Sequence, residues 1–201
     1  MKLTKYLNLH LEGELRLNCW KTVNFSRQYG SQRLFILSAL TMLFTFILLY
    51  IPATYLFVAT NFYDNHFTYF ILALILLYPA HKLLHFLPIA HLNDKIRKVV
   101  EIKCGFIPTI KIQITEPIRK YQFLIALLSP FMIINTGLLI ASFIFPHYAH
   151  YFTILIAYHI GICVPDLIYG KDVIRSPKNA FIEENEDGFE ILIIKKERTS
   201  H

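Results

Sequence analysis

Charged residues are scarce in this chain of 201 residues, at 17% of the total, whereas about a quarter of an average soluble domain is charged. Hydrophobic residues make up 55% and are gathered into long blocks. This composition excludes a disordered chain and a coiled coil. Cysteine is scarce as well, and the odd set of Cys19, Cys104 and Cys163 excludes a small disulfide scaffold.

The hydrophobic blocks are long enough to cross a membrane. A span needs about 20 apolar helical residues. Four segments qualify: Leu34 to Val58, Phe67 to Ala90, Tyr121 to Phe145 and Tyr148 to Tyr169. The sequence therefore predicts an all-α membrane protein with four transmembrane helices. We expect no cleavable signal peptide, because the first apolar block is too long for one.

Lys and Arg are missing from the two short connections between these spans, near Thr60–His66 and at Pro146–His147. Of the 20 Lys and Arg, all but Lys82 lie in three segments: residues 1–33, residues 91–120 and the tail after Tyr169. Positively charged loops stay in the cytoplasm, so we expect a multi-pass protein of the cell membrane with both termini cytoplasmic. Nucleic acid is excluded as a partner, because the basic segments lack interleaved stacking aromatics; the expected partner is the lipid bilayer.

The chain divides into three parts by the same criteria. They are a cytoplasmic N-terminal segment (1–33), a four-helix transmembrane domain with a cytoplasmic 91–120 loop (34–169), and a cytoplasmic tail (170–201). Trp20, which precedes the first span, is expected to mark a helix resting on the membrane surface.

Two short β elements are expected in the cytoplasmic parts. Within the 91–120 loop, isoleucines alternate with polar residues over 110–115, which is the period of a short strand. In the tail, Ala180–Glu184 and Phe189–Ile194 flank Asp187-Gly188. A turn dipeptide between apolar runs predicts a C-terminal β-hairpin.

Ionisable side chains inside a span are costly, and each one is a candidate functional residue. His81 and His85 are four residues apart in the second span, so they share one helix face. This spacing suits two imidazole ligands of one zinc ion. Histidines that hydrogen-bond neighbouring helices explain the pair equally well. Interhelical hydrogen bonds are also expected of Ser129 and Asn135 in the third span.

A polar stripe follows one face of the fourth span, where His159, Cys163 and Asp166 are spaced i, i+4 and i+7. Pro165 cannot donate to the carbonyl of Gly161, so a kink is expected there. A carboxylate beside opened backbone favours a site over plain packing. Cys163 is a candidate fourth metal ligand, and the role of a small buried hydrophobic residue explains it as well.

The predicted topology brings these groups to similar depth. At the rise of a helix, His85 lies about 8 Å from the cytoplasmic end of the second span, and Asp166 lies about 5 Å from the end of the fourth. Two helices that are distant in sequence therefore present a histidine pair and a carboxylate in the same leaflet.

Four short motifs between about residues 65 and 194 match a known pattern: His81-Lys82-Leu83-Leu84-His85, Leu128-Ser129-Pro130-Phe131, Pro165-Asp166-Leu167 and Asp187-Gly188. In these motifs the chain resembles the bacterial zincin membrane-peptidase family, whose architecture is related to that of the site-2 proteases. The resemblance implies a zinc ion held by His81, His85 and Asp166, with His159 as an alternative third ligand.

Lys82 stands where the active pattern of that family has a glutamate, the general base that takes a proton from zinc-bound water. An ammonium group offers three donors and no lone pair. Lys82 is therefore expected to be non-catalytic unless its proton affinity is strongly lowered.

Three functions remain open from the sequence. The first is a zinc-binding pseudopeptidase or membrane adaptor, which binds transmembrane segments of other membrane proteins without cutting them. The second is an active membrane metallopeptidase with a substitute base: Asp166, Glu116 or Lys82 itself. The third is a metal-free structural membrane protein in which Lys82 and Asp166 form an ion pair.

Overall fold

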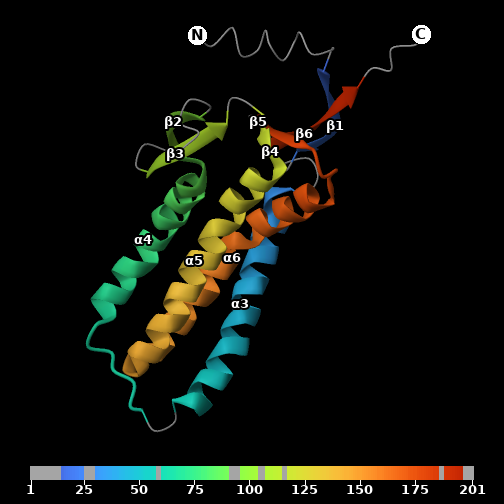
Figure 1. Ribbon diagram of the computed structural model, residues 1–201. Coiled ribbons are helices and arrows are strands. Elements are labelled where there is room, and N and C mark those ends of the chain that lie inside the picture. Colours follow the sequence, from blue (N-terminus) through green and yellow to red (C-terminus); the bar gives the residue numbers. More distant parts are fainter. Residues whose placement is uncertain are drawn as a thin grey trace, which may run out of the picture.

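The computed structural model describes residues 15–24, 30–57, 60–90, 96–103, 107–114, 117–185 and 188–196. Four long helices dominate it (Figure 1): α3 (Ser31–Leu56), α4 (Phe67–Phe86), α5 (Lys120–Ile144) and α6 (Ala149–Arg175). A short 3-10 helix, η2 (Pro146–Tyr148), joins α5 to α6. All four long helices are long and apolar enough to cross a membrane, as the sequence predicts.

The helices begin and end close to the predicted limits. The fourth differs most, since α6 continues to Arg175 and therefore extends six residues beyond Tyr169. Helical propensity and packing extend α6 beyond the end of its apolar segment. Both α4 and α6 continue as unbroken helices through their prolines, Pro79 and Pro165. The opening expected at these prolines therefore does not interrupt either helix.

Helix α6 is the centre of the bundle. It packs against α3 on one side and against α5 on the other, and α4 contacts both α5 and α6 (Figure 1). Gly161 lies where α6 meets α3. A Cβ added there would lie 3.0 Å from Met42 Cβ and 3.1 Å from the Ser38 carbonyl oxygen. Gly161 therefore permits the close approach of two helices, a role that the sequence did not indicate.

One end of the bundle has a four-stranded antiparallel sheet in the order β1-β6-β5-β4. Its strands are β1 (Leu15–Asn24), β4 (Ile118–Arg119), β5 (Phe181–Asn185) and β6 (Gly188–Lys196). The predicted hairpin is present as β5 and β6, with Asn185 opposite Gly188; Asp187 is outside the described residues. A Cβ on Gly188 would overlap the Val23 carbonyl oxygen, so glycine is required at that position.

The first strand corrects the expectation for Trp20. Residues 15–24 pair with β6 along its whole length, and the register shifts between Cys19 and Lys21. Trp20 thus lies at a β-bulge in a strand and not in a surface helix. The sequence-based expectation was wrong because the partner of β1 is distant in sequence, and strand preference depends on that partner.

Strands β2 (Ile96–Lys103) and β3 (Ile107–Ile114) form a separate antiparallel pair. The short strand predicted over 110–115 lies within β3, except for its last residue, which is outside the described part. The sequence did not indicate its partner, β2.

Buried apolar side chains attach the four-stranded sheet to the bundle. They come from β1, the end of α6 and the hairpin: Val23, Val173, Ala180, Ile182, Phe189 and Ile191. Lys120, at the start of α5, is also buried and donates to the carbonyl oxygens of Ile174 (2.8 Å) and Ser176 (2.6 Å). Since the last carbonyls of a helix have no partner within the helix, Lys120 closes the end of α6.

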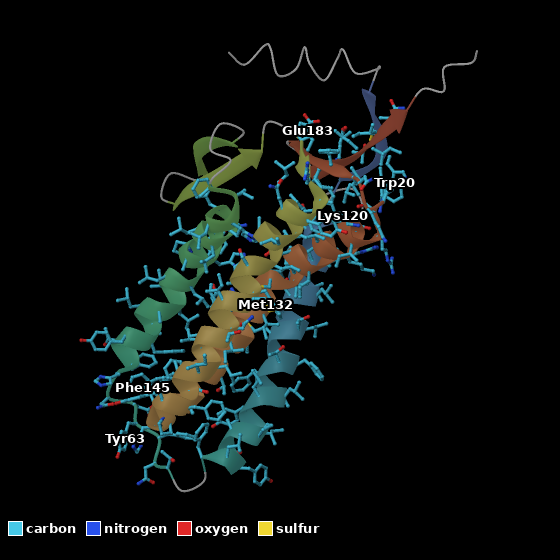
Figure 2. The ribbon with its side chains drawn as sticks, viewed as in Figure 1. Trp20, Tyr63, Lys120, Met132, Phe145 and Glu183 are labelled. Atoms are coloured by element: carbon cyan, nitrogen blue, oxygen red, sulfur yellow. The ribbon has the colours of Figure 1, made fainter. Side chains whose placement is uncertain are left out.

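Figure 2 shows Trp20, Lys120 and Glu183 at the sheet end and Tyr63 and Phe145 at the opposite end. Helix α4 begins near that opposite end, so its last turns, which contain His81 and His85, approach the sheet end (Figure 1).

We predict that Gly161→Ala lowers the thermal unfolding temperature of the detergent-solubilised protein. Overpacking costs about 1–3 kcal/mol, which exceeds the gain of about 1 kcal/mol from the better helix propensity of alanine. Gly137→Ala in α5 is the matched control, because no atom lies within 4 Å of its added Cβ. An equal or higher unfolding temperature for Gly161→Ala would contradict the close approach of α3 and α6.

Candidate metal centre

Three helices supply a cluster of polar side chains near the sheet end of the bundle. His81 and His85 come from the last turns of α4, and His159, Cys163 and Asp166 come from the middle of α6. Helix α5 lies beside both and supplies Asn135 and backbone carbonyls. The four predicted ligand residues are therefore gathered in one place, but they form two groups that share His81.

The first group, which we call the outer triad, consists of His81, His85 and Asp166. His81 Nε2 lies 3.1 Å from His85 Nε2 and 3.1 Å from Asp166 Oδ2. His85 Nε2 lies 3.5 Å from the same carboxylate oxygen. Ligand atoms bound tetrahedrally to zinc at about 2.0–2.1 Å are about 3.3–3.4 Å apart. The spacing of the outer triad matches that value.

The second group, the inner triad, consists of His81, His159 and Cys163. His159 approaches the opposite edge of the His81 ring, with its Nε2 3.1 Å from His81 Nδ1. His159 therefore lies on the far side of His81 from Asp166 and does not complete the outer triad.

Hydrogen bonds determine which ring nitrogens carry protons. Asn135 Nδ2 donates to the Phe131 carbonyl oxygen (2.8 Å), so Asn135 Oδ1 is the atom that faces His159 Nδ1 at 3.0 Å. The amide oxygen can only accept, so His159 Nδ1 carries the proton. A neutral His159 then has a lone pair on Nε2, which accepts from His81 Nδ1–H. His81 Nε2 is left with a lone pair directed at the outer triad.

His85 is oriented in the same way from the other side. Its Nδ1 lies 2.9 Å from the Ala126 carbonyl oxygen, to which it donates. Its Nε2 therefore also has a lone pair, 3.1 Å from that of His81. With both imidazoles neutral, two lone pairs and a carboxylate converge with no proton between them. Such an arrangement is repulsive unless a cation is present. Histidines that bind a metal usually donate their other ring N–H to an outer acceptor, as His81 and His85 do here.

Ser129 holds the two helices together at this point. Its hydroxyl lies 2.7 Å from the Leu84 carbonyl oxygen of α4 and 3.0 Å from the Ala126 carbonyl oxygen of its own helix, and it can donate to either. Ser129 and Asn135 therefore both form interhelical hydrogen bonds, as expected. The sequence could not predict that the Ala126 carbonyl orients His85, because every residue type has this backbone acceptor.

Access to solvent differs between the two groups. The exposed fraction of the side chain is 19% for His85 and 14% for Asp166, whereas His81, His159 and Cys163 are at most 1% exposed. The outer triad is thus the face of the cluster that an external ligand can reach. The outer triad would hold a metal ion through three side chains, which is the number of protein ligands in catalytic zinc sites.

Lys82 does not pair with Asp166. Its ammonium nitrogen lies 5.9 Å from the centre of the Tyr78 ring. Among the described residues Lys82 forms no ion pair, and Asp166 contacts His81 and His85 instead. The ion pair between Lys82 and Asp166, which was expected for a metal-free structural protein, is therefore not formed. Of the substitute bases considered, Asp166 belongs to the outer triad and Glu116 lies outside the described residues.

Comparison with known protein families gives one match. A family model described as "putative zincin peptidase" matches residues 74–181, which is more than half of the chain. The matched segment contains all the residues of both triads and Lys82. Searches among curated proteins and among solved structures gave no match.

We predict that Asn135→Leu weakens zinc binding about 10- to 100-fold, the usual effect of removing an outer partner of a ligating histidine. Without the amide oxygen, His159 no longer has a fixed tautomer and does not orient His81. Titration against a coloured zinc chelator measures the change. Ser142→Ala is the control, since Ser142 bonds only within α5, to the Leu139 carbonyl oxygen. Equal zinc affinity in Asn135→Leu and the wild type would contradict the orienting hydrogen bonds from Asn135 through His159 to His81.

Proposed function

Because the chain belongs to this family of zincin peptidases, we propose that it is a zinc-binding pseudopeptidase of the membrane, which binds segments of other membrane proteins without hydrolysing them. The zinc ligands in this proposal are His81, His85 and Asp166. The supporting observation is the convergence of two imidazole lone pairs and one carboxylate oxygen at separations of 3.1–3.5 Å. The donor set of two nitrogens and one oxygen suits zinc with one position open.

A bound zinc ion supplies Lewis acidity, which polarises a carbonyl or lowers the pKa of a bound water. The residues of the chain supply the rest. His159 and Asn135 orient His81, the Ala126 carbonyl orients His85, and Asp166 contributes the negative charge that offsets part of the dication.

The lysine at position 82 argues against hydrolysis. Peptide hydrolysis needs a group that accepts a proton from the attacking water, and such catalysis contributes about 10²- to 10⁴-fold. Lys82 occupies the family's base position with an ammonium, which has no lone pair. The ammonium lies over the Tyr78 ring, 5.9 Å from its centre, at the distance of a cation–π contact. The site can therefore hold a polar atom of a partner but cannot activate water through residue 82.

The proposed partners are membrane-embedded protein segments. The surface of α4 beside the ligands is apolar and open, with Leu83 68% and Leu87 62% exposed. An apolar helix of another protein fits such a surface, and its backbone is the only polar group that it brings. We place the site at the cytoplasmic side of the cell membrane, with both termini inside. Two observations support this orientation: β1 and β6 are paired at the sheet end, and basic residues dominate the corresponding segments.

We predict that the protein, purified in detergent and dialysed against zinc, contains about one zinc per chain, and that His85→Ala and Asp166→Asn each reduce this to less than about 0.2. Elemental analysis gives the ratio. His66→Ala is the control for loss of a histidine at the opposite end of α4, where His66 packs on Tyr69 and Tyr148. Metal-free wild-type protein that folds normally would refute zinc binding.

We also predict that the wild type does not cleave a reporter transmembrane peptide, and that Lys82→Glu cleaves it at least about 100-fold above background, since only the base is missing. Lys82→Gln is the matched control, because it removes the charge without adding a base. Cleavage by Lys82→Glu should be lost in the double variant with His85→Ala. Chelator-sensitive cleavage by the wild type would contradict the pseudopeptidase assignment and show that another group serves as base.

A further inference from the structure

The inner triad has no role in the outer zinc site beyond the hydrogen bond between His159 and His81. Cys163 Sγ lies 3.6 Å from His159 Nε2 and 3.8 Å from His81 Nδ1. The two nitrogens are themselves 3.1 Å apart. Three potential ligand atoms thus surround one point on the inner side of His81, and all three side chains are buried.

These separations fit a metal ion. With metal–sulfur and metal–nitrogen bonds of about 2.3 Å and 2.0–2.1 Å in tetrahedral geometry, sulfur and nitrogen lie about 3.5 Å apart and two nitrogens about 3.3–3.4 Å apart. A cysteine that only fills space has no need of two imidazole nitrogens around its sulfur. The sulfur position is therefore more specific than a packing role requires.

We propose that His81, His159 and Cys163 form a second metal position, which binds Cu⁺ in place of zinc. Thiolate is a soft ligand that suits Cu⁺ and Zn²⁺ alike. Charge favours Cu⁺, because Cu⁺ with one thiolate and two neutral imidazoles is electrically neutral, whereas Zn²⁺ with the same three ligands carries a positive charge. Coordination number favours Cu⁺ as well, because structural zinc sites almost always have four ligands and this group offers three buried ones.

Binding of Cu⁺ releases one proton in total and needs no redox step. The cysteine thiol loses its proton to solvent as the copper–sulfur bond forms, and the copper stays Cu⁺ throughout. His81 changes tautomer: Nδ1 gives up its proton and Nε2 takes one up from solvent, so that Nδ1 bears the lone pair. Its Nε2–H then donates to Asp166 Oδ2, which is 3.1 Å away. His159 keeps its Nδ1–H bond to Asn135, so its Nε2 lone pair is available without any change.

The two positions are exclusive as long as His81 is a neutral imidazole, because it has one lone pair to offer. Nε2 carries it for zinc in the outer triad, and Nδ1 carries it for copper in the inner triad. Cu⁺ in the inner triad therefore prevents zinc from binding His81 in the outer triad. The inner position itself does not require that zinc binds in the outer one.

The test uses the full-length protein with Cys19→Ser and Cys104→Ser, so that Cys163 is the remaining thiol. Titration of Cu⁺ without oxygen, in competition with a coloured Cu⁺ chelator, should give one copper per chain. Cys163→Ser should weaken Cu⁺ binding at least about 100-fold, beyond the usual effect of an outer partner. Ser142→Ala should leave it within about threefold, since Ser142 donates to the Leu139 carbonyl oxygen within α5. Saturating zinc should raise the apparent Kd for Cu⁺.

Copper X-ray absorption covers the case in which Cys163→Ser fails to fold. The protein that retains Cys163 should show one sulfur and two imidazoles bound to copper. Absence of sulfur would overturn the proposal, and so would unchanged Cu⁺ affinity in a folded Cys163→Ser variant. Equal losses in Cys163→Ser and Ser142→Ala would also overturn it, by showing that the loss is not specific to Cys163. Copper binding through Cys163 in a protein that never binds zinc would refute the proposed function but leave this inference standing.

Discussion

The carboxamide of Asn135 sets the direction of the hydrogen bonds in the centre of the bundle. Its nitrogen is bonded to its own helix at the Phe131 carbonyl, so its oxygen faces His159. From that single constraint the protons of His159 and His81 follow in turn, and a lone pair of His81 is left facing Asp166 and His85. The Ala126 carbonyl imposes the same orientation on His85. The site is thus a place where acceptors meet without donors, which is the condition that a cation satisfies.

The bundle makes this convergence possible through the central position of α6. Gly161 admits α3 on one side of that helix, and α5 covers the other. Helix α4 brings its histidines to α6 only in its last turns, and Ser129 of α5 holds it there through the Leu84 carbonyl. At the sheet end, Lys120 and the strands that pair with β6 anchor α5 and α6 next to the site. The contacts that pack the helices therefore also position the residues of the site.

The sequence predicted the features that depend on local composition. Four apolar blocks gave the four helices, and the turn dipeptide gave the hairpin. Helical spacing combined with charge placed His81, His85 and Asp166 in proximity. The features that the sequence left open depend on contacts between segments that are distant in sequence. The strand at Trp20 needs β6 in order to form, and the side of His81 on which His159 lies is decided by how α4 and α6 pack. The ligand alternatives could therefore be separated only by the three-dimensional arrangement.

In the function that we propose, this chain differs from an active zincin peptidase in the charge of residue 82. A glutamate at position 82 would offset the metal and accept a proton, whereas lysine adds positive charge and accepts none. X-ray absorption at the zinc edge of the zinc-loaded protein identifies the atoms bound to the metal. If zinc binds His81, His85 and Asp166, the spectrum shows two imidazole nitrogens and carboxylate or water oxygens at about 2.0–2.2 Å. A sulfur ligand at about 2.3 Å, or a shell without two imidazoles, would contradict this set of ligands.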